Sequence, residues 1–332
     1  MNSFKIVSRP LGTVECFVIR RNDGAELEIL SGFGAGLNAW RVPCKAFASQ
    51  TGENGLVDLL FGYRDGSTIH QLAPDTNAGC RLTPFPGRTA FAKFNWNGTT
   101  YQLENNVSWA PHALHGFLQN KPWKFQSFES DSEKGVAIFS CDWPGAFAGF
   151  PFPFRAVNKV TFTGESFTVE SSVTNIGAKP MPYSEGWHPY FMLGGKVDDL
   201  VMDLPESKLA LLDSADLPTG NFKDDTRFVG GRKIGGEFIN DCFCLGEEFA
   251  NAKISDGTCA HVTLKSENQA LIIWQQTGVE QYNAIQIYTP PDRKSIAIEP
   301  MTAEPDALNH HRGLIVVTPG ETKTFTFGAS LK

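Results

Sequence analysis

Several features that would assign this chain to a class are missing from its sequence. No run of about 18 apolar residues exists, so we predict no transmembrane helix. The first residues, Met1 to Val7, lack the long apolar core of a signal peptide, and we expect a cytoplasmic protein. The net charge is -7, with 36 acidic and 29 basic side chains. A chain without a basic excess predicts neither a nucleic-acid partner nor binding to an anionic membrane surface.

The cysteines do not form a metal-binding pattern. There are seven, an odd number at scattered positions. Cys242 and Cys244 would lie on one face of a strand, but no second Cys or His pair completes a zinc set. His310 and His311 are adjacent, and adjacent residues on a strand point apart. We therefore predict reduced, mostly buried thiols, no structural metal and no cofactor.

A sustained helical period is also missing. Apolar residues do not recur at helical spacing over ten or more residues anywhere in the chain. The glycine-rich stretch 31–37 lacks the lysine of a phosphate-binding loop and no helix pattern follows it, so a dinucleotide site is the weaker alternative to a tightly turning strand. We expect one short turn at 302–308, and loops at 64–78 and 198–219.

Short strands are what the sequence does contain. Alternating segments at 155–164 and 166–175 predict a hairpin that turns at Gly164-Glu165, and 91–96 with 101–103 predict another that turns at Asn97-Gly98. Many short strands without intervening helices are typical of an antiparallel β-sandwich rather than an α/β fold. Because no linker or composition shift divides the chain, we predict a single domain over residues 1–332.

Four polar positions interrupt this β pattern: Arg88, His115 (with His112 nearby), His188 and Glu299. Each adjoins proline, glycine or aromatic residues. A histidine and a glutamate that face each other can act as general acid and general base. Each residue also has a purely structural interpretation, since a histidine beside aromatics is often a hydrogen-bonded core residue and an arginine is often a surface charge.

The motifs around these positions resemble those of one family. The segment Gly186-Trp187-His188-Pro189-Tyr190-Phe191-Met192-Leu193 resembles the G-x-H-P-Y-F-x-L signature of the aldose 1-epimerases, or galactose mutarotases. Leu114-His115-Gly116 is similar to that family's L-H-G segment. Pro86-Gly87-Arg88 resembles its arginine loop, and Ile298-Glu299-Pro300-Met301-Thr302 its glutamate motif. The motifs occur in the family order between about residues 80 and 310.

The resemblance implies a large antiparallel supersandwich of the galactose mutarotase type, with few short helices and a monosaccharide bound in a cleft. It implies an isomerase that interconverts the α and β anomers of a free aldose such as galactose or glucose. By motif position, Glu299 would be the base and His188 the acid, while Arg88 and His115 would bind the sugar. Asp241 would match the sugar-binding aspartate, with His112 as a further candidate. We expect a monomer or a homodimer.

Two alternatives to a free-aldose mutarotase stay open from the sequence. One is an epimerase of hexose 6-phosphates, because basic residues that would hold a phosphate cannot be identified. The other is a sugar-binding protein that has the fold but no turnover, because a fold does not by itself imply an activity.

Overall fold

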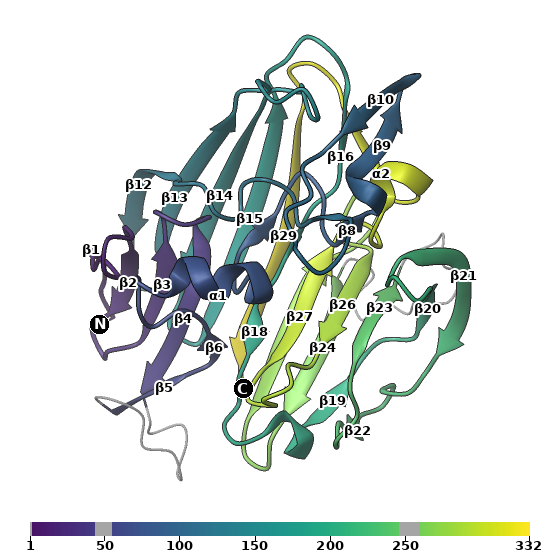
Figure 1. The fold of residues 1–332 in the computed structure, drawn as a ribbon. Coiled ribbons are helices and arrows are strands. Elements are labelled where there is room, and N and C mark those ends of the chain that lie inside the picture. The colour runs from purple at the N-terminus through teal and green to yellow at the C-terminus, as the bar shows by residue number, and fades with distance from the viewer. Residues whose placement is uncertain (1, 44–54, 246–258) are drawn as a thin grey trace.

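A computed structural model describes residues 2–43, 55–245 and 259–332 of the chain (Figure 1). The strands of this part form three larger antiparallel sheets. The first sheet has the order β1-β2-β3-β4-β5: β1 (Phe4–Ser8), β2 (Phe17–Arg21), β3 (Glu26–Leu30), β4 (Gly36–Pro43) and β5 (Leu56–Asp58).

The second sheet contains the longest strands and runs through the middle of the molecule (Figure 1). Its order is β12 (Lys124–Ser130), β13 (Gly135–Trp143), β14 (Phe154–Phe162), β15 (Ser166–Asn175), β29 (Thr322–Leu331), β25 (Ala270–Gln276), β24 (Cys259–Lys265), β19 (Val201–Asp203) and β22 (Arg232–Lys233). The β14–β15 hairpin is confirmed: Phe162 lies opposite Phe167 across the turn at Gly164. Buried and partly exposed residues alternate along both arms, as their period of two predicts.

The third sheet carries most of the candidate site. Its order is β21 (Pro218–Asp225), β20 (Ser207–Leu212), β23 (Asn240–Cys244), β26 (Ala284–Tyr288), β27 (Ile296–Met301), β17 (Gly186–Trp187) and β7 (Arg81–Leu82), with β18 (Tyr190–Phe191) pairing both β27 and β6 (Leu60–Phe61). Three small ladders complete the strands: β8 (Arg88–Thr89) with β11 (Ala113–Leu114), β9 (Lys93–Trp96) with β10 (Thr99–Gln102), and β16 (Met181–Tyr183) with β28 (Ile315–Val317). The β9–β10 hairpin turns at Asn97-Gly98 as predicted.

Aromatic contacts join the sheets face to face. Trp40 of the first sheet packs edge-on against Phe167 of the second, with ring centroids 5.3 Å apart. Trp187 of the third sheet packs on Phe327 of the second at 5.4 Å. One buried apolar cluster includes residues of all three sheets. Burial of aromatic surface between facing sheets is the main stabilisation of such a sandwich, and the predicted all-β sandwich class is confirmed.

Two expectations about loops were wrong. The segment predicted as loop at 64–78 contains helix α1 (Ile69–Thr76), which buries Ile69 and Ala73 and ends at Asn77 in the left-handed conformation. Eight residues with a proline are too few to show a helical period, so packing determines this helix. The segment 198–219 contains the short helix η4 (Val197–Asp199), β19, β20 and the start of β21.

The remaining helices are short. The 3₁₀ helix η3 spans Ala90–Ala92, and α2 (Ala307–His310) overlaps only the end of the turn expected at 302–308. No described helix has the length and apolar character to cross a membrane. The six cysteines that the structure describes are free thiols, in line with the sequence, and Cys44 lies outside the described residues.

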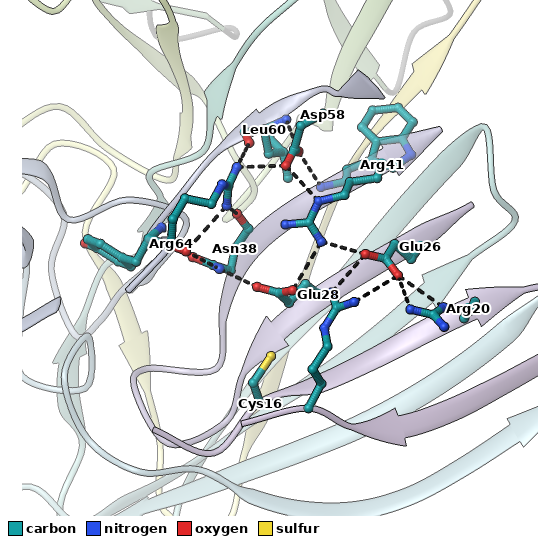
Figure 2. Close-up of polar contacts among 12 residues, drawn as sticks. Cys16, Arg20, Glu26, Glu28, Asn38, Arg41, Asp58, Leu60 and Arg64 are labelled. Carbon is teal, nitrogen blue, oxygen red and sulfur yellow. Dashed lines mark hydrogen bonds and ion pairs between the residues drawn. The ribbon is translucent and has the colours of Figure 1, made fainter. Parts of the chain in front are cut away.

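The first sheet carries a cluster of ion pairs on its outer face (Figure 2). Glu26 is almost fully buried and receives hydrogen bonds from Arg9, Arg20 and Arg41. Burial alone would raise the pKa of Glu26, but the three guanidinium groups outweigh burial and lower it to about 2. Arg41 also pairs with Asp58 of β5, so the cluster joins β2, β3, β4 and β5.

Candidate active site

A cavity of about 290 Å³ opens over the third sheet and brings the four predicted polar positions together. Arg88, His115, His188 and Glu299 all line it. They arrive from the β8–β11 ladder, from the loop after β17 and from β27. The volume is near the lower end of the range of about 300–1,000 Å³ that is usual for small-molecule sites.

His188 and Glu299 face each other at the centre of this cavity. Nε2 of His188 lies 3.4 Å from Oε1 of Glu299, and both residues are buried. β-Pairing fixes this approach, because Gly186 pairs with Met301 and Tyr190 pairs with Ala297 on either side of the two residues. The imidazole stacks on the Tyr190 ring with centroids 4.8 Å apart.

The backbone of His188 is held from the side of β7. Its N–H donates to the carbonyl of Cys80 at 3.0 Å, and its carbonyl accepts from the N–H of Gly79 at 2.8 Å. Nδ1 of the ring is buried and has no hydrogen-bond partner among the described residues. The ring is therefore positioned by backbone contacts and stacking, while Nε2 is directed at Glu299.

Burial moves the pKa values of Glu299 and His188 in opposite directions. Desolvation raises the pKa of Glu299 well above its ordinary value and lowers the pKa of His188 to about 4. Both shifts disfavour charge, so burial by itself favours a protonated carboxyl beside a neutral imidazole. Across the middle pH range the pair thus holds one proton that either side chain can carry.

His115 presents a hydrogen-bond donor to the cavity. The ring Nδ1 of His115 accepts a hydrogen bond from the backbone N–H of Gly87 at 3.1 Å. The backbone N–H of His115 donates to the Gly87 carbonyl at 3.0 Å. Burial, then the neighbouring His188 and Arg88, lower the pKa of His115 well below its ordinary value. A neutral ring whose Nδ1 accepts must carry its proton on Nε2, which is then available as a donor.

Arg88 lies where the loop Pro86-Gly87-Arg88 contacts the segment that follows Glu299. Its guanidinium bonds to Asp216 at 2.9 Å and lies over the Trp109 ring at 5.1 Å from the centroid. Its carbonyl accepts from the N–H of Asp306 at 2.7 Å. Burial lowers the pKa of Arg88, but the group is too basic to lose its proton. Arg88 is thus a fixed cation at the edge of the cavity.

Gly87 allows the two loops to approach this closely. Its φ is +64°, and a Cβ at this position would lie 2.9 Å from the ring of Pro305. Only glycine adopts this backbone conformation without strain and leaves room for the proline.

Two of the sequence candidates do not line the cavity. His112 is buried, and its Nδ1 accepts from the N–H of Phe91 at 3.1 Å, so it supports the backbone beside Arg88. The carboxylate of Asp241 bonds to Arg227. Because side chains alternate along β23, its neighbour Asn240 faces the cavity instead. Neither His112 nor Asp241 therefore lies among the residues that line this cavity.

Other lining residues were missed from the sequence. Gln286 is the direct cross-strand neighbour of Glu299, and its amide donates to Oδ1 of Asn240 at 2.9 Å. Tyr288, two residues further along β26, lines the same cavity, as do Trp109 and Asp75. Alternation along 284–288 places Gln286 and Tyr288 on one face, but only strand pairing shows that this face is that of Glu299.

Behind the site lies a buried polar network that the sequence did not reveal. Arg81 and Glu185 form an ion pair in which neither side chain is exposed to solvent. Arg81 also donates to Asn158 and to the Ser172 carbonyl of the second sheet, while Glu185 accepts from the hydroxyl of Tyr282 at 2.6 Å. The network joins the second sheet to β7 and β17, which lead directly to His188.

A metal site is not evident among the residues that the structure describes, where no group of three His, Cys, Asp or Glu side chains converges. The polar groups that line the cavity instead include the facing Glu299 and His188, a second histidine, one arginine, the carboxyl group of Asp75 and three amides. This set can move protons and bind hydroxyl groups.

Comparison with proteins of known sequence adds two relatives from Escherichia coli K12. The uncharacterized protein YihR is 25% identical over 264 residues, which cover 76% of this chain and 79% of YihR. The uncharacterized protein YphB is 36% identical over 119 residues, but this match covers only 36% of this chain and 38% of YphB.

Solved structures of similar fold span the whole chain. A galactose mutarotase-like protein from Clostridium acetobutylicum has a TM-score of 0.82 at 18% identity, over 99% of this chain and 98% of its own. Galactose 1-epimerase from Lactobacillus acidophilus has a TM-score of 0.78 at 14% identity, over 100% of this chain and 99% of its own. At such identities the likeness shows the fold. The aldose 1-epimerase family model matches residues 15–330, and the chain belongs to the aldose 1-epimerase family.

Proposed function

We propose that this protein interconverts the α and β anomers of a free aldose by opening and closing the sugar ring. The observation that carries the proposal is the Glu299–His188 pair, whose nearest atoms lie 3.4 Å apart in a cavity large enough for a small ligand. Ring opening needs one proton removed at O1 and one donated at the ring oxygen, and these two atoms are neighbours on the same carbon.

In the reactive state Glu299 is a carboxylate and His188 carries the proton. Glu299 removes the proton of the O1 hydroxyl while His188 donates its proton to the ring oxygen. The C1–O5 bond breaks, C1 becomes an aldehyde, and the pair is left as a protonated carboxyl and a neutral imidazole. Rotation about C1–C2 followed by the reverse transfers gives the other anomer, with the pair restored.

Sugar binding promotes the charged form of the pair. Burial by itself favours the neutral form because it penalises both charges. A hydroxyl that donates to Glu299 and a ring oxygen that accepts from His188 stabilise the carboxylate and the imidazolium respectively. The Nε2–H of His115 and the guanidinium of Arg88 would hold further oxygens of the ring in place.

The charge of the cavity favours a free aldose over a hexose phosphate. Arg88 is the one lysine or arginine among the described residues that line the cavity, and Asp216 already pairs with it. Asp75 adds a carboxyl group to the lining. A phosphate would thus meet Arg88, which is already paired with Asp216, and the carboxyl group of Asp75. Phosphate sites normally offer several free hydrogen-bond donors.

The decisive experiment is polarimetry of freshly dissolved α-D-glucose and α-D-galactose, with wild type, Glu299→Gln and His188→Asn. We expect wild type to accelerate equilibration and each variant to lose at least about 100-fold in kcat, the usual contribution of a general acid or base. His112→Asn serves as a matched histidine control that should keep most of the activity, since His112 lies outside the cavity.

Two outcomes would count against the proposal. Equilibration by wild type that is no faster than buffer, for every aldose tried, would favour a sugar-binding protein without turnover. Full activity of Glu299→Gln would remove the assigned base even if the protein is an epimerase.

A further inference from the structure

The short ladder of β8 and β11 carries one cavity residue and leads directly to another. Arg88 lies opposite Leu114 in this ladder, and His115 follows Leu114 in the sequence. Each strand of the ladder has only two residues. A pairing this short is marginally stable by itself, so other contacts must hold Arg88 and His115 in place.

Asp306 bonds to the outer edge of β8. Its backbone N–H donates to the carbonyl of Arg88 at 2.7 Å, and its side-chain Oδ1 accepts from the N–H of Ala90 at 2.8 Å. The carbonyl of one residue and the N–H two residues later project from the same edge of a strand, where a neighbouring strand would normally bond both. Asp306 therefore takes the place of a neighbouring strand beside Arg88.

Asn106 bonds to the outer edge of β11 in a similar way. Its side-chain amide donates to the carbonyl of Leu114 and accepts from the N–H of Leu114, both at 2.8 Å. These two bonds use both backbone polar groups of the residue that precedes His115. The ladder is thus flanked by one polar side chain at each edge, and neither Asp306 nor Asn106 lines the cavity of Glu299.

Asp306 also connects the ladder to the strand of the proposed base. It lies in the segment that directly follows β27, the strand that carries Glu299. The start of this segment is fixed, because the N–H of Thr302 donates to the carbonyl of Glu185 at 2.8 Å and the hydroxyl of Thr302 accepts from the N–H of Glu185 at 2.9 Å. Hydrogen bonds to the backbone therefore set the position of Arg88 relative to Glu299.

We propose that Asp306 and Asn106 are positioning residues, which hold Arg88 and His115 where they bind the oxygens of the sugar. This inference rests on the proposed mutarotase function. Neither side chain would touch the sugar itself. Loss of either side-chain acceptor leaves a backbone N–H of the ladder without its partner, which is costly unless the strand shifts toward water. Such a shift would move the side chains that the ladder carries.

The test uses the variants Asp306→Gly, Asp306→Asn and Asn106→Ala. The φ of Asp306 is +67°, which glycine adopts without strain, so Asp306→Gly removes the carboxylate without straining the backbone. Asparagine tolerates the same φ and keeps an oxygen that can accept from Ala90. Asp131→Gly is the matched control, because Asp131 accepts two backbone N–H bonds in the exposed turn between β12 and β13 and does not line the cavity.

Steady-state kinetics of anomer exchange with glucose separate binding from chemistry. We expect Asp306→Gly and Asn106→Ala to raise KM about tenfold or more and to keep kcat within about threefold, because Arg88 and His115 bind the sugar in the ground state and in the transition state alike. Asp306→Asn should keep KM within about threefold of wild type, and Asp131→Gly within about twofold. An unchanged KM in either loss variant, or an equal rise for Asp306→Asn and Asp306→Gly, would overturn the inference.

Double variants show whether each positioning residue acts through its partner. In an Arg88→Gln background, Asp306→Gly should change kcat/KM by no more than about twofold, since the side chain that it positions is already gone. Asn106→Ala should behave in the same way in a His115→Gln background. Losses that multiply would mean that the effect does not pass through Arg88 or His115, and they would overturn the inference.

NMR of labelled arginine separates this inference from the mutarotase proposal. Among the described residues, Nε of Arg88 is buried and has no hydrogen-bond partner, so burial protects its hydrogen from exchange with water. Asp306→Gly should speed this exchange at least about tenfold, while Asp306→Asn keeps it within about threefold. Unchanged exchange in Asp306→Gly would refute the positioning role even if glucose is equilibrated. Faster exchange in a protein that equilibrates no aldose would keep the positioning of Arg88 and refute the mutarotase.

Discussion

Replacing Glu185 with glutamine tests whether the buried ion pair behind the site holds the two sheets together. The carboxylate of Glu185 and the guanidinium of Arg81 are both inaccessible to solvent. Arg81 reaches across to Asn158 of β14 at 2.9 Å. Glutamine keeps the volume of the side chain and part of its hydrogen bonding, but leaves the arginine charge buried without a counter-charge.

The expected loss of stability is about 3–5 kcal/mol, the usual result of removing one partner from a buried ion pair. Burial alone would lower the pKa of Arg81, but Glu185 and the neighbouring tyrosines raise it above its ordinary value in the wild type. A guanidinium is too basic to lose its proton at neutral pH, so Arg81 stays charged in the variant as well. An unfolding entropy of about 2.1 cal/mol/K per residue over 332 residues is about 0.7 kcal/mol/K. The loss then corresponds to a fall in Tm of about 4–7 °C.

The assay is thermal and urea denaturation of wild type, Glu185→Gln and a matched control. Glu170→Gln is suitable, because Glu170 pairs with Lys159 on the exposed face of the β14–β15 hairpin, where both side chains are at least 40% exposed. Exposed pairs contribute about 0–1 kcal/mol, so the control should melt within about 1–2 °C of wild type.

A Tm for Glu185→Gln that matches the control would refute this account of the network. It would mean that hydrogen bonds from Arg81 to Asn158 and to backbone carbonyls suffice to hold the charge. The double variant Arg81→Met/Glu185→Gln should recover part of the loss, since it no longer buries an unpaired charge.

Three further predictions follow from the site. The pH profile of kcat/KM, measured by NMR exchange corrected for buffer catalysis, should be broad: the Glu299–His188 pair gains a second proton only as pH falls toward about 4, and loses its one proton only above the raised pKa of Glu299. An acidic limb centred near 6.5, the ordinary pKa of histidine, would contradict this pair. Asp216→Asn should raise KM by no more than about fivefold, since the partly exposed ion pair of Asp216 with Arg88 contributes about 1 kcal/mol or less. An increase in KM above about tenfold in steady-state kinetics would contradict a position of Asp216 at the edge of the cavity. Gly87→Ala should cost about 1–3 kcal/mol in urea denaturation because of its positive φ and the close Pro305 ring, and unchanged stability would show that the loop can relax.

The sequence alone determined the class of the fold and the identity of the central residues. Period-two alternation over 155–175 predicted the hairpin, because each residue there is buried or partly exposed according to its side of the sheet. The residues Arg88, His115, His188 and Glu299 stand out because polar side chains beside glycine, proline and aromatics interrupt apolar strands. Such patterns involve only residues that are neighbours in the sequence, so they can be recognised without knowledge of the fold.

Tertiary structure decided which polar side chains share the cavity. Asp241 and Asn240 are adjacent in the sequence, and only the orientation of β23 shows that the amide faces the cavity while the carboxylate pairs with Arg227. Helix α1 is too short to show a period, yet it contributes part of the wall of the cavity. The Arg81–Glu185 pair joins residues 104 positions apart, which no pattern along the chain encodes. Contacts of this kind depend on strand order and register, and these are set by packing between sheets rather than by neighbouring residues.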